Sequence, residues 1–361
     1  MPTAAPTFAS LIDELTTRGV PAELLRPSES SWRLRVVEAK RTLVRRGQRA
    51  KTVAFVLDGE LSVRIKQVEV DRLERGTSFG LAPAITRNGL HPHEVIALRR
   101  TVVAELAGEA LLALRSAGAP LYAALLRLEL RSLAQRMTQT GTRLTSIQAG
   151  TFPLQTRRGA SVLGRLWRSM RTRDPDGPPL EPLLRALPGL RDAPAPVIAE
   201  LTAALRPCSF AAREVIALEG EQEDSIYLIA SGQVDVLRTT STGTATVMLA
   251  ALREGTLFGM VSLLSETPRS ASCVAADAVH LYKMTHAAHD ALGREAGPAW
   301  RECLANVLHR QLVTAYTSLI AALRVFETTG PAAGPGPNES LVQRVPSPRA
   351  DDPDDPDDQP G

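Results

Sequence analysis

The residues of this sequence that are best placed to do chemistry lie between positions 258 and 275. There Arg269 follows a proline and precedes the small residues Ser270 and Ala271. A guanidinium fixed on a proline-containing turn presents its N–H groups as a planar fork, which suits an anion with two oxygens. Small neighbours leave the backbone amides free to add further donors. The segment therefore favours a site for a small anionic group, and the alternative is an arginine on a surface turn.

This segment belongs to a sequence that occurs twice in the chain. Residues 42–63, TLVRRGQRAKTVAFVLDGELSV, match residues 215–236, VIALEGEQEDSIYLIASGQVDV, without a gap. Further on, LERGTSFG at 73–80 matches LREGTLFG at 252–259, after an insertion in the region of residues 239–243. An insertion at a polar turn between matched strands is what loops tolerate. We therefore expect one fold to occur twice.

Each repeat predicts a small antiparallel barrel or jelly roll, so the chain as a whole is of the mixed α+β class. Short runs with alternating apolar residues, such as Ile226 and Leu228, are interrupted by Gly, Asn, Asp, Ser or Thr turns. Helical sequence follows each barrel, over residues 120–147 and again near the end of the second repeat. The second helix carries an apolar stripe of Leu304, Leu308, Leu312, Tyr316, Leu319 and Leu323. Such a stripe is expected either to close over a ligand or to form a dimer seam.

The cassette at residues 258–271, FGMVSLLSETPRSA, resembles the phosphate-binding cassette of cyclic-nucleotide-binding domains. In that family Phe-Gly-Glu is followed by small or apolar residues, a Leu, a short spacer and Pro-Arg-x-Ala. The resemblance extends over residues 184–323, in the family's order of helix, barrel, cassette, barrel and C-terminal helix. It implies two β-roll barrels in tandem with flanking helices, similar to regulatory subunits and to catabolite-activator-like proteins.

The resemblance also implies roles for individual residues. Arg269 would anchor the phosphate of a cyclic nucleotide, helped by amides near residues 270–272. The predicted ligand-binding set is Phe258, Gly259, Met260, Leu263, Arg269, Ser270, Ala271 and Ser272. Met260 stands where the family has a Glu that accepts from the ribose 2′-hydroxyl, and losing such a bond costs about 1.5–3 kcal/mol. The expected outcomes are weak nucleotide binding, a different cyclic nucleotide or dinucleotide, or a structural remnant.

The first repeat departs further from the family pattern. At the shared Phe-Gly, Leu81 replaces the Glu, and at a constant offset Gly89 and Leu90 fall on the Pro-Arg positions. Arg87 lies close enough in sequence to serve as a substitute anchor. The sequence favours a domain that kept its fold and lost its ligand.

Between the barrels, QTRRGAS at residues 155–161 resembles the Arg-Arg-x-Ala pseudosubstrate of cyclic-nucleotide-dependent kinase regulatory subunits, through Arg157, Arg158 and Ala160. In that family the motif precedes both domains, whereas here it lies between them. Apolar residues interleaved with arginines then predict a basic amphipathic helix over residues 162–173. Such a helix either packs between the domains or lies on an anionic membrane surface.

Composition narrows the function classes. The formal net charge of +3 is too small to indicate a nucleic-acid partner by itself. Cys208, Cys273 and Cys303 have no paired spacing, which indicates a reducing compartment, and the chain starts without a leader-like segment. We therefore expect a cytoplasmic protein without a transmembrane segment. Two His pairs with ligand-like spacing lack companion ligands, and no nucleophile triad or phosphate loop is visible, so neither an enzyme, a metal nor a cofactor is expected.

The expected organisation has four parts: a degenerate domain with an N-terminal helix at 1–147, a basic linker at 148–178, a cyclic-nucleotide-binding domain at 179–328 and a disordered Pro/Gly/Asp-rich tail at 329–361. No helix-turn-helix sequence follows the last helix, so direct DNA binding is not expected. The expected function is a sensor in which cAMP or cGMP in the second barrel shifts the C-terminal helix, and so regulates a protein partner or a homodimer. The alternative is a ligand-free scaffold built on two degenerate domains.

Overall fold

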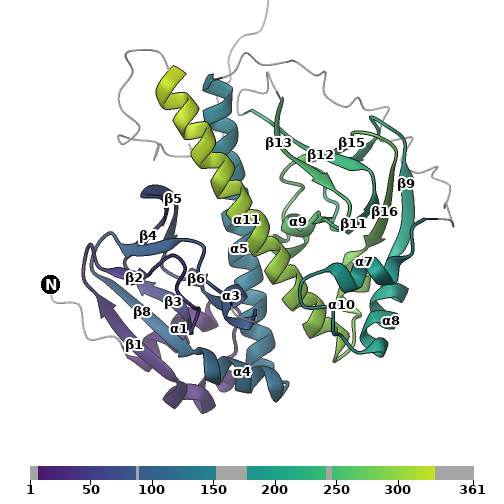
Figure 1. Cartoon of the computed structure of the whole chain (residues 1–361). Helices are drawn as coiled ribbons and strands as arrows, with labels where there is room; N and C mark the ends of the chain where they lie inside the picture. Colours follow the sequence, from purple (N-terminus) through teal and green to yellow (C-terminus); the bar gives the residue numbers. More distant parts are fainter. Residues whose placement is uncertain (1–6, 87–88, 152–176, 241–245, 330–361) are drawn as a thin grey trace, which may run out of the picture.

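The computed structural model describes residues 7–86, 89–151, 177–240 and 246–329, which form two barrels on either side of a pair of long helices (Figure 1). The first barrel consists of β1 (Trp32–Val37), β2 (Thr42–Val44), β3 (Thr52–Asp58), β4 (Glu60–Ile65), β5 (Val68–Glu74), β6 (Ser78–Phe79), β7 (Glu94–Ala97) and β8 (Thr101–Ala107). The second consists of β9 (Arg206–Phe210), β10 (Val215–Ala217), β11 (Ile226–Ser231), β12 (Gln233–Thr239), β13 (Thr246–Arg253), β14 (Leu257–Phe258), β15 (Ser272–Ala275) and β16 (Val279–Met284).

The two barrels have the same strand order. The sheets of the first run β1-β8-β3-β6 and β2-β7-β4-β5, and those of the second run β9-β16-β11-β14 and β10-β15-β12-β13. An irregularity of register also recurs, between Val56 and Asp58 in β3 and between Ile229 and Ser231 in β11. Such bulges bend a strand at a defined place, so their recurrence shows that the barrels are built alike. The predicted pair of β-roll barrels is confirmed.

Helices flank both barrels. Those of the first repeat are α1 (Phe8–Thr16), α2 (Ala22–Leu25), the 3-10 helix η1 (Arg26–Ser31), α3 (Leu81–Ile85), α4 (Gly108–Ser116) and α5 (Pro120–Thr151). Those of the second are α7 (Leu180–Ala186), α8 (Ala195–Ala204), α9 (Met260–Ser265), α10 (His286–Asp290) and α11 (Ala296–Thr329). The start of α10 is fixed by a local hydrogen bond, because the side chain of the N-cap residue Thr285 accepts from the Ala288 amide at 3.2 Å. The two long helices are each slightly longer than their periodicity predicts.

The long helices α5 and α11 lie side by side and run in the same direction (Figure 1). The Tyr122 hydroxyl of α5 donates to Glu302 of α11 at 2.7 Å, and Arg136 Nη2 donates to the Tyr316 hydroxyl at 2.8 Å. Both pairs are 180 residues apart, which fixes the parallel direction and the register. Each long helix also contacts the opposite barrel, α5 through α9 and β13 and α11 through α3 and β5.

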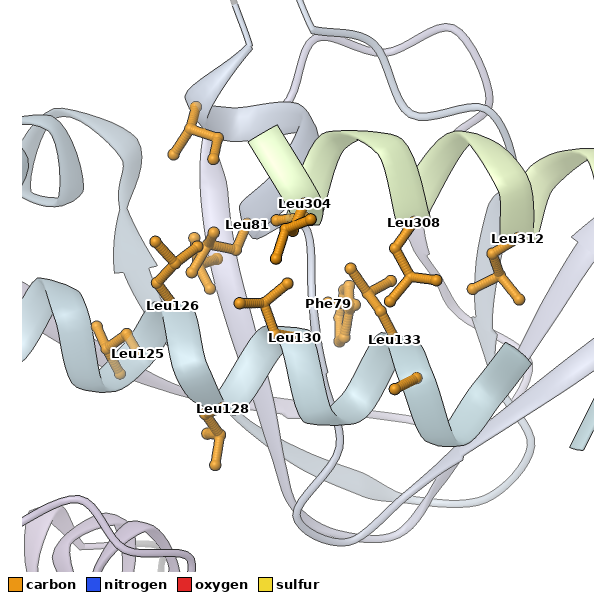
Figure 2. Close-up of a cluster of buried hydrophobic side chains, with 14 of the residues drawn as sticks. Phe79, Leu81, Leu125, Leu126, Leu128, Leu130, Leu133, Leu304, Leu308 and Leu312 are labelled. Atoms are coloured by element: carbon orange, nitrogen blue, oxygen red, sulfur yellow. The ribbon is translucent and has the colours of Figure 1, made fainter. Parts of the chain in front are cut away.

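The apolar stripe of α11 is covered inside the chain. Leu304, Leu308, Tyr316 and Leu319 are fully buried against α5 and the first barrel. Figure 2 shows leucines of both helices meeting in one cluster with Phe79 and Leu81 of the first repeat. Burial of each such leucine contributes about 1.5–3 kcal/mol. The expectation of a homodimer seam at this stripe is therefore wrong, because the chain's own α5 occupies the surface that a second copy would need.

Among the described residues no single helix is both long and apolar enough to cross a membrane. One bent pair, α4 with residues 120–148 of α5, passes the length and composition test only when the two are taken together across a 117° bend.

Candidate ligand-binding site

A cavity of about 370 Å³ lies against the second barrel, within the size range of ligand pockets, about 300–1,000 Å³. Helices α5 and α11 form one side of it, and β12, β13 and the cassette form the other. Its lining residues are Met137, Thr138, Gly141 and Leu144 of α5; Arg310, Gln311, Thr314, Ala315 and Ser318 of α11; Val236, Arg238, Leu249, Ala250 and Leu252 of the strands; and residues 258–262, 269–271 and 273 of the cassette region. Because α5 follows the first barrel, both repeats contribute to the cavity.

Arg269 lies in the cavity wall, with its side chain only 4% exposed. Its Nη1 donates to the Gly259 carbonyl at 2.8 Å and to Ser262 Oγ at 2.9 Å, and its Nη2 donates to the Ser225 carbonyl at 2.7 Å. Its Nε is buried and has no hydrogen-bond partner. A buried donor without a partner costs about 1–3 kcal/mol, and an anion oxygen that reached Nε would remove that cost.

The shared Phe-Gly pair has a backbone explanation. Gly259 has a φ of +84°, and a Cβ there would lie 2.5 Å from the Ser225 carbonyl and 2.7 Å from Arg269 Nη1. Gly80 in the first repeat has a φ of +92°, and its Cβ would lie 2.7 Å from the Thr52 carbonyl. Only glycine fits a left-handed residue so close to a neighbouring strand. The Phe-Gly motif is therefore required by the turns that lead into α9 and α3, whether or not a ligand binds there.

A second layer of side chains holds Arg269 in place. The Tyr227 hydroxyl donates to Glu223 Oε1 at 2.6 Å, Lys283 Nζ donates to the same oxygen at 3.0 Å, and Glu223 Oε2 lies 3.7 Å from Arg269 Nη2. Burial alone would raise the pKa of Glu223, but the hydrogen bonds from Tyr227 and Lys283 outweigh it and hold that pKa below its ordinary value. The Tyr227 ring stacks on Phe258 with centroids 5.1 Å apart. A carboxylate fixed in this way orients the guanidinium.

Met260 is 1% exposed and belongs both to the cavity lining and to the hydrophobic core, at the point where α9 packs against α5. A thioether sulfur is at best a weak acceptor. Where the family has a Glu, this chain therefore has the apolar side chain of Met260 in the wall of the cavity.

The charge of the cavity lining is positive. Arg238, Arg269 and Arg310 belong to it, and the described lining residues include no Asp or Glu. Arg238 Nη1 donates to the Thr138 carbonyl of α5 at 3.2 Å, and its Nε lies 3.7 Å from Glu219 Oε1. Cations in a partly enclosed, low-dielectric cavity attract an anion more strongly than they would on an open surface.

Most of the predicted binding residues line this cavity: Phe258, Gly259, Met260, Arg269, Ser270 and Ala271. Leu263 packs into the hydrophobic core instead, and the Ser272 hydroxyl accepts from the Glu219 amide at 2.9 Å. The pseudosubstrate-like residues Arg157, Arg158 and Ala160, the predicted helix at 162–173 and the acidic tail lie outside the described residues.

The contribution of α5 was missed by sequence reasoning. No local pattern reveals it, because Thr138 reaches the cavity only through the pairing of α5 with α11. Arg238 was missed too, although it lies on β12 just before the insertion that makes the second repeat longer than the first. A comparison of the two repeats position by position could have marked it, since the first repeat has Ile65 at the matching place.

In the first repeat, His91 takes the place of the arginine. The His91 carbonyl accepts from the Gly47 amide at 2.8 Å, as the Arg269 carbonyl does from the Gly220 amide at 2.8 Å. His91 is 5% exposed, and burial lowers its pKa. A neutral, buried imidazole cannot pair with an anion as a guanidinium does.

The expectation that Gly89 and Leu90 occupy the Pro-Arg positions is therefore wrong by one residue. The offset between the repeats falls from 179 at the shared glycines to 178 at His91, because the segment from Gly80 to His91 is one residue longer than its counterpart from Gly259 to Arg269. The other candidate anchor, Arg87, lies outside the described residues.

The first repeat fills the counterpart of the cavity with its own side chains. In β4 and β12, Val63 pairs with Asp71 as Val236 pairs with Ala250, so Asp71 and Ala250 are equivalent. By the same symmetry Asp71, Arg136 and Tyr316 correspond to Ala250, Thr314 and Thr138, all of which line the second cavity. Leu81, at the position of Met260, packs into the leucine cluster of Figure 2. Large side chains thus stand where the second repeat has small ones.

Two histidines beside this filled pocket are neutral in the folded protein. Burial, followed by neighbouring Arg136, His91 and Arg310, lowers the pKa of His309 to about 4. Burial is also the largest reason that the pKa of His93 lies well below its ordinary value. The unfolded chain takes up these protons at about pH 6.5. The stability contribution is therefore complete above pH 6.5 and is lost as the pH falls toward 4.

We accordingly expect the urea midpoint of unfolding to be lower at pH 5 than at pH 7, and the His309→Gln variant to show a smaller decrease. The comparison of variant and wild type isolates His309 from the other groups that titrate over the same range. Equal decreases in the two proteins would show that His309 is not responsible for the acid sensitivity.

Comparison with known proteins identifies the domain family. Residues 34–117 and 207–295 each match the family described as "Cyclic nucleotide-binding domain". The chain is also similar to the "Cyclic AMP receptor protein" of Thermus thermophilus, with 39% identity over 94 residues that make up 26% of this chain and 43% of that protein. The chain thus spans less than half the length of this relative.

Among solved structures, the chain overlaps the regulatory domain of Toxoplasma gondii PKA with cAMP at 17% identity and a TM-score of 0.32, covering 84% of this chain and 95% of that one. It overlaps a cyclic nucleotide-binding domain from Methylobacillus flagellatus at 20% identity and a TM-score of 0.37, covering 39% and 80%.

The two family matches coincide with the two barrels, each with its own cassette segment between the sixth and seventh strands. The barrels also share one strand order and the same bulge. The chain is therefore a protein of tandem cyclic nucleotide-binding domains.

Proposed function

We propose that the second repeat binds one cyclic nucleotide, cAMP or cGMP, with its phosphate at Arg269. The observation that carries this proposal is Arg269, whose buried Nε has no hydrogen-bond partner and which lines a cavity that contains three arginines and no carboxylate among its described lining residues. A cyclic phosphodiester has one negative charge and two free oxygens, which suit charge-assisted hydrogen bonds from a buried guanidinium. Backbone amides near Ser270 and Ala271 would add donors.

A ligand in this cavity would touch helices from both repeats, because α5 and α11 both line it. It would shift the protein toward whichever arrangement of the two helices gives it the better contacts, and no shift follows without such a difference. We propose that this movement of the helix pair, rather than of α11 alone, is the signal passed to a protein partner.

We further propose that the protein is a non-enzymatic regulator in the cytoplasm. Its matched family is a family of binding domains. Within the described parts of the chain, no three His, Cys, Asp or Glu residues are grouped to hold a metal ion. Cys273 and Cys303 are buried free thiols, as is usual in a reducing compartment.

A ligand-free scaffold is the second candidate, and one observation favours it. Two of the guanidinium nitrogens of Arg269 already donate to three acceptors of the protein. A phosphate would have to use Nε or displace one of these bonds. Met260 adds to this reading, since it removes the acceptor that the family supplies to the ribose.

Calorimetric titration with cAMP and with cGMP separates the two candidates. The proposed function predicts saturable heat with at least one of them. No heat with either nucleotide at millimolar concentration would favour the scaffold.

The nature of Met260 leads to a prediction about ligand chemistry. Because no carboxylate accepts from the ribose, we expect the 2′-deoxy analogue of the preferred nucleotide to bind as tightly as the parent, within a few-fold. A retained hydroxyl contact would instead weaken the analogue by about ten- to a hundredfold, the cost of one charge-assisted bond. Competition titration of the two nucleotides measures the difference, and a large preference for the parent would show that another group replaces the missing Glu.

A further inference from the structure

The filled pocket of the first repeat contains a three-residue polar cluster, Asp71, Arg136 and Tyr316, which we call the lock. Arg136 Nε donates to Asp71 Oδ2 at 2.7 Å, and Arg136 Nη2 donates to the Tyr316 hydroxyl at 2.8 Å. The Tyr316 hydroxyl in turn donates to Asp71 Oδ2. The Arg136 and Asp71 side chains are 6% and 8% exposed, and Tyr316 is fully buried. The lock is thus a closed ring of hydrogen bonds inside the protein.

The lock joins three elements that a ligand would join in the second repeat. Asp71 lies on β5, Arg136 on α5 and Tyr316 on α11. The second cavity is bounded by the equivalent strand, β13, and by the same two helices. In the first repeat, side chains of the protein therefore make the connection that the second repeat leaves open.

The lock also lies directly behind the wall of the second cavity. Met137 and Thr138, which line that cavity, follow Arg136 along α5, and Ala315, which also lines it, precedes Tyr316 on α11. Successive residues of a helix point about 100° apart, since 3.6 residues make a turn. The same turns of α5 and α11 thus carry the lock on one side and the cavity wall on the other.

The polar character of the lock fixes position more narrowly than apolar packing would. A leucine seam tolerates small shifts of one helix along the other, because dispersion contacts are not directional. A ring of three hydrogen bonds in a dry interior is lost when its donors and acceptors move by a fraction of their spacing. The lock therefore sets the register of α5 against α11 at the turns that face the second cavity.

We propose that the lock is a built-in substitute for a ligand in the first repeat, and that Asp71, Arg136 and Tyr316 are positioning residues for the nucleotide site of the second repeat. This inference rests on the proposed binding of a nucleotide there. On this view the first repeat holds α5 and α11, which form one wall of the cavity in the second repeat, in place.

Two variants of the full chain test the proposal. Tyr316→Phe removes one hydroxyl and keeps the ring, and the double variant Asp71→Asn with Arg136→Met removes both charges together. We expect each to weaken cyclic nucleotide binding by about tenfold, within the usual range of coupling between sites. Val53→Ala is the matched control, because it removes buried methyl groups of the first barrel, where Val53 is fully buried, and leaves the lock intact. It should lower the melting temperature without changing the nucleotide affinity.

Hydrogen–deuterium exchange of the ligand-free proteins tests the proposal apart from nucleotide binding. Peptides covering residues 137–144 and 314–318 should exchange faster in both lock variants than in wild type and in Val53→Ala. Faster exchange in the lock variants, found together with a wild-type chain that binds no nucleotide, would retain the positioning and remove the proposed function. Unchanged exchange in these peptides would show that the lock serves stability alone. Lock variants that melt at a lower temperature yet bind nucleotide as wild type does would show the same.

Discussion

Replacing Arg269 with alanine should reduce the affinity of the second repeat for its cyclic nucleotide by at least about a hundredfold. Each charge-assisted hydrogen bond to the phosphate is worth about 1.5–3 kcal/mol, and two of them correspond to a factor of a hundred or more. No other cation of the cavity lining is as deeply buried, since Arg310 is exposed and the Arg238 side chain is 17% exposed. Titration calorimetry of the variant and the wild type measures the loss.

The same substitution also removes donors from the Gly259 and Ser225 carbonyls, so its effect on folding must be separated from its effect on binding. Circular dichroism and the melting temperature of the variant establish that it is folded at the temperature of the titration. Arg253→Ala, an exposed arginine on β13 of the same barrel, is the matched control and should bind as wild type does. A folded Arg269→Ala protein that binds normally would remove Arg269 from the site.

Replacing Arg136 alone with methionine should lower the free energy of unfolding by about 3–5 kcal/mol, because it leaves the Asp71 carboxylate buried without its cation. Burial alone would lower the pKa of Arg136, but Tyr316 and Asp71 outweigh it and raise that pKa, so the guanidinium stays charged. The double variant, Arg136→Met with Asp71→Asn, should lose less stability than the two single variants added together. Urea denaturation of the four proteins completes the cycle.

The control for this cycle is an ion pair of similar length on the surface. Arg185 Nε and Glu181 Oε1 of α7 are 2.9 Å apart, with side chains 34% and 60% exposed, and a pair this open to solvent contributes about 0–1 kcal/mol. The lock is not a coupled network if Arg136→Met lowers the free energy of unfolding no more than Arg185→Met does. Strictly additive effects of the Arg136 and Asp71 substitutions would lead to the same conclusion.

The sequence predicted the fold of this chain well, for physical reasons. A barrel strand needs alternating apolar residues, and its turns need residues that tolerate special backbone angles. Gly80 and Gly259 illustrate this, because both adopt a left-handed conformation against a neighbouring strand. Such requirements are local and appear in each repeat separately, so the duplication was visible without any structure.

The walls of the site could not be predicted in the same way. Thr138 and Thr314 reach one cavity only because α5 and α11 pair in parallel, and their spacing in sequence carries no signal of that pairing. The lock was hidden for the same reason, since Arg136 and Tyr316 are 180 residues apart. The one extra residue before His91 also displaced the comparison of the two cassettes, and it concealed which residue replaces the arginine.

The central claim is that one repeat binds a nucleotide while the other is filled by the protein itself. Equilibrium dialysis of the full chain against labelled cyclic nucleotide, carried to saturation, tests it most directly by counting the molecules bound per chain. The account predicts a plateau at one. A plateau at two would show that the pocket behind Asp71, Arg136 and Tyr316 opens to ligand, and no binding at saturating concentration would contradict the assignment of a nucleotide site at Arg269.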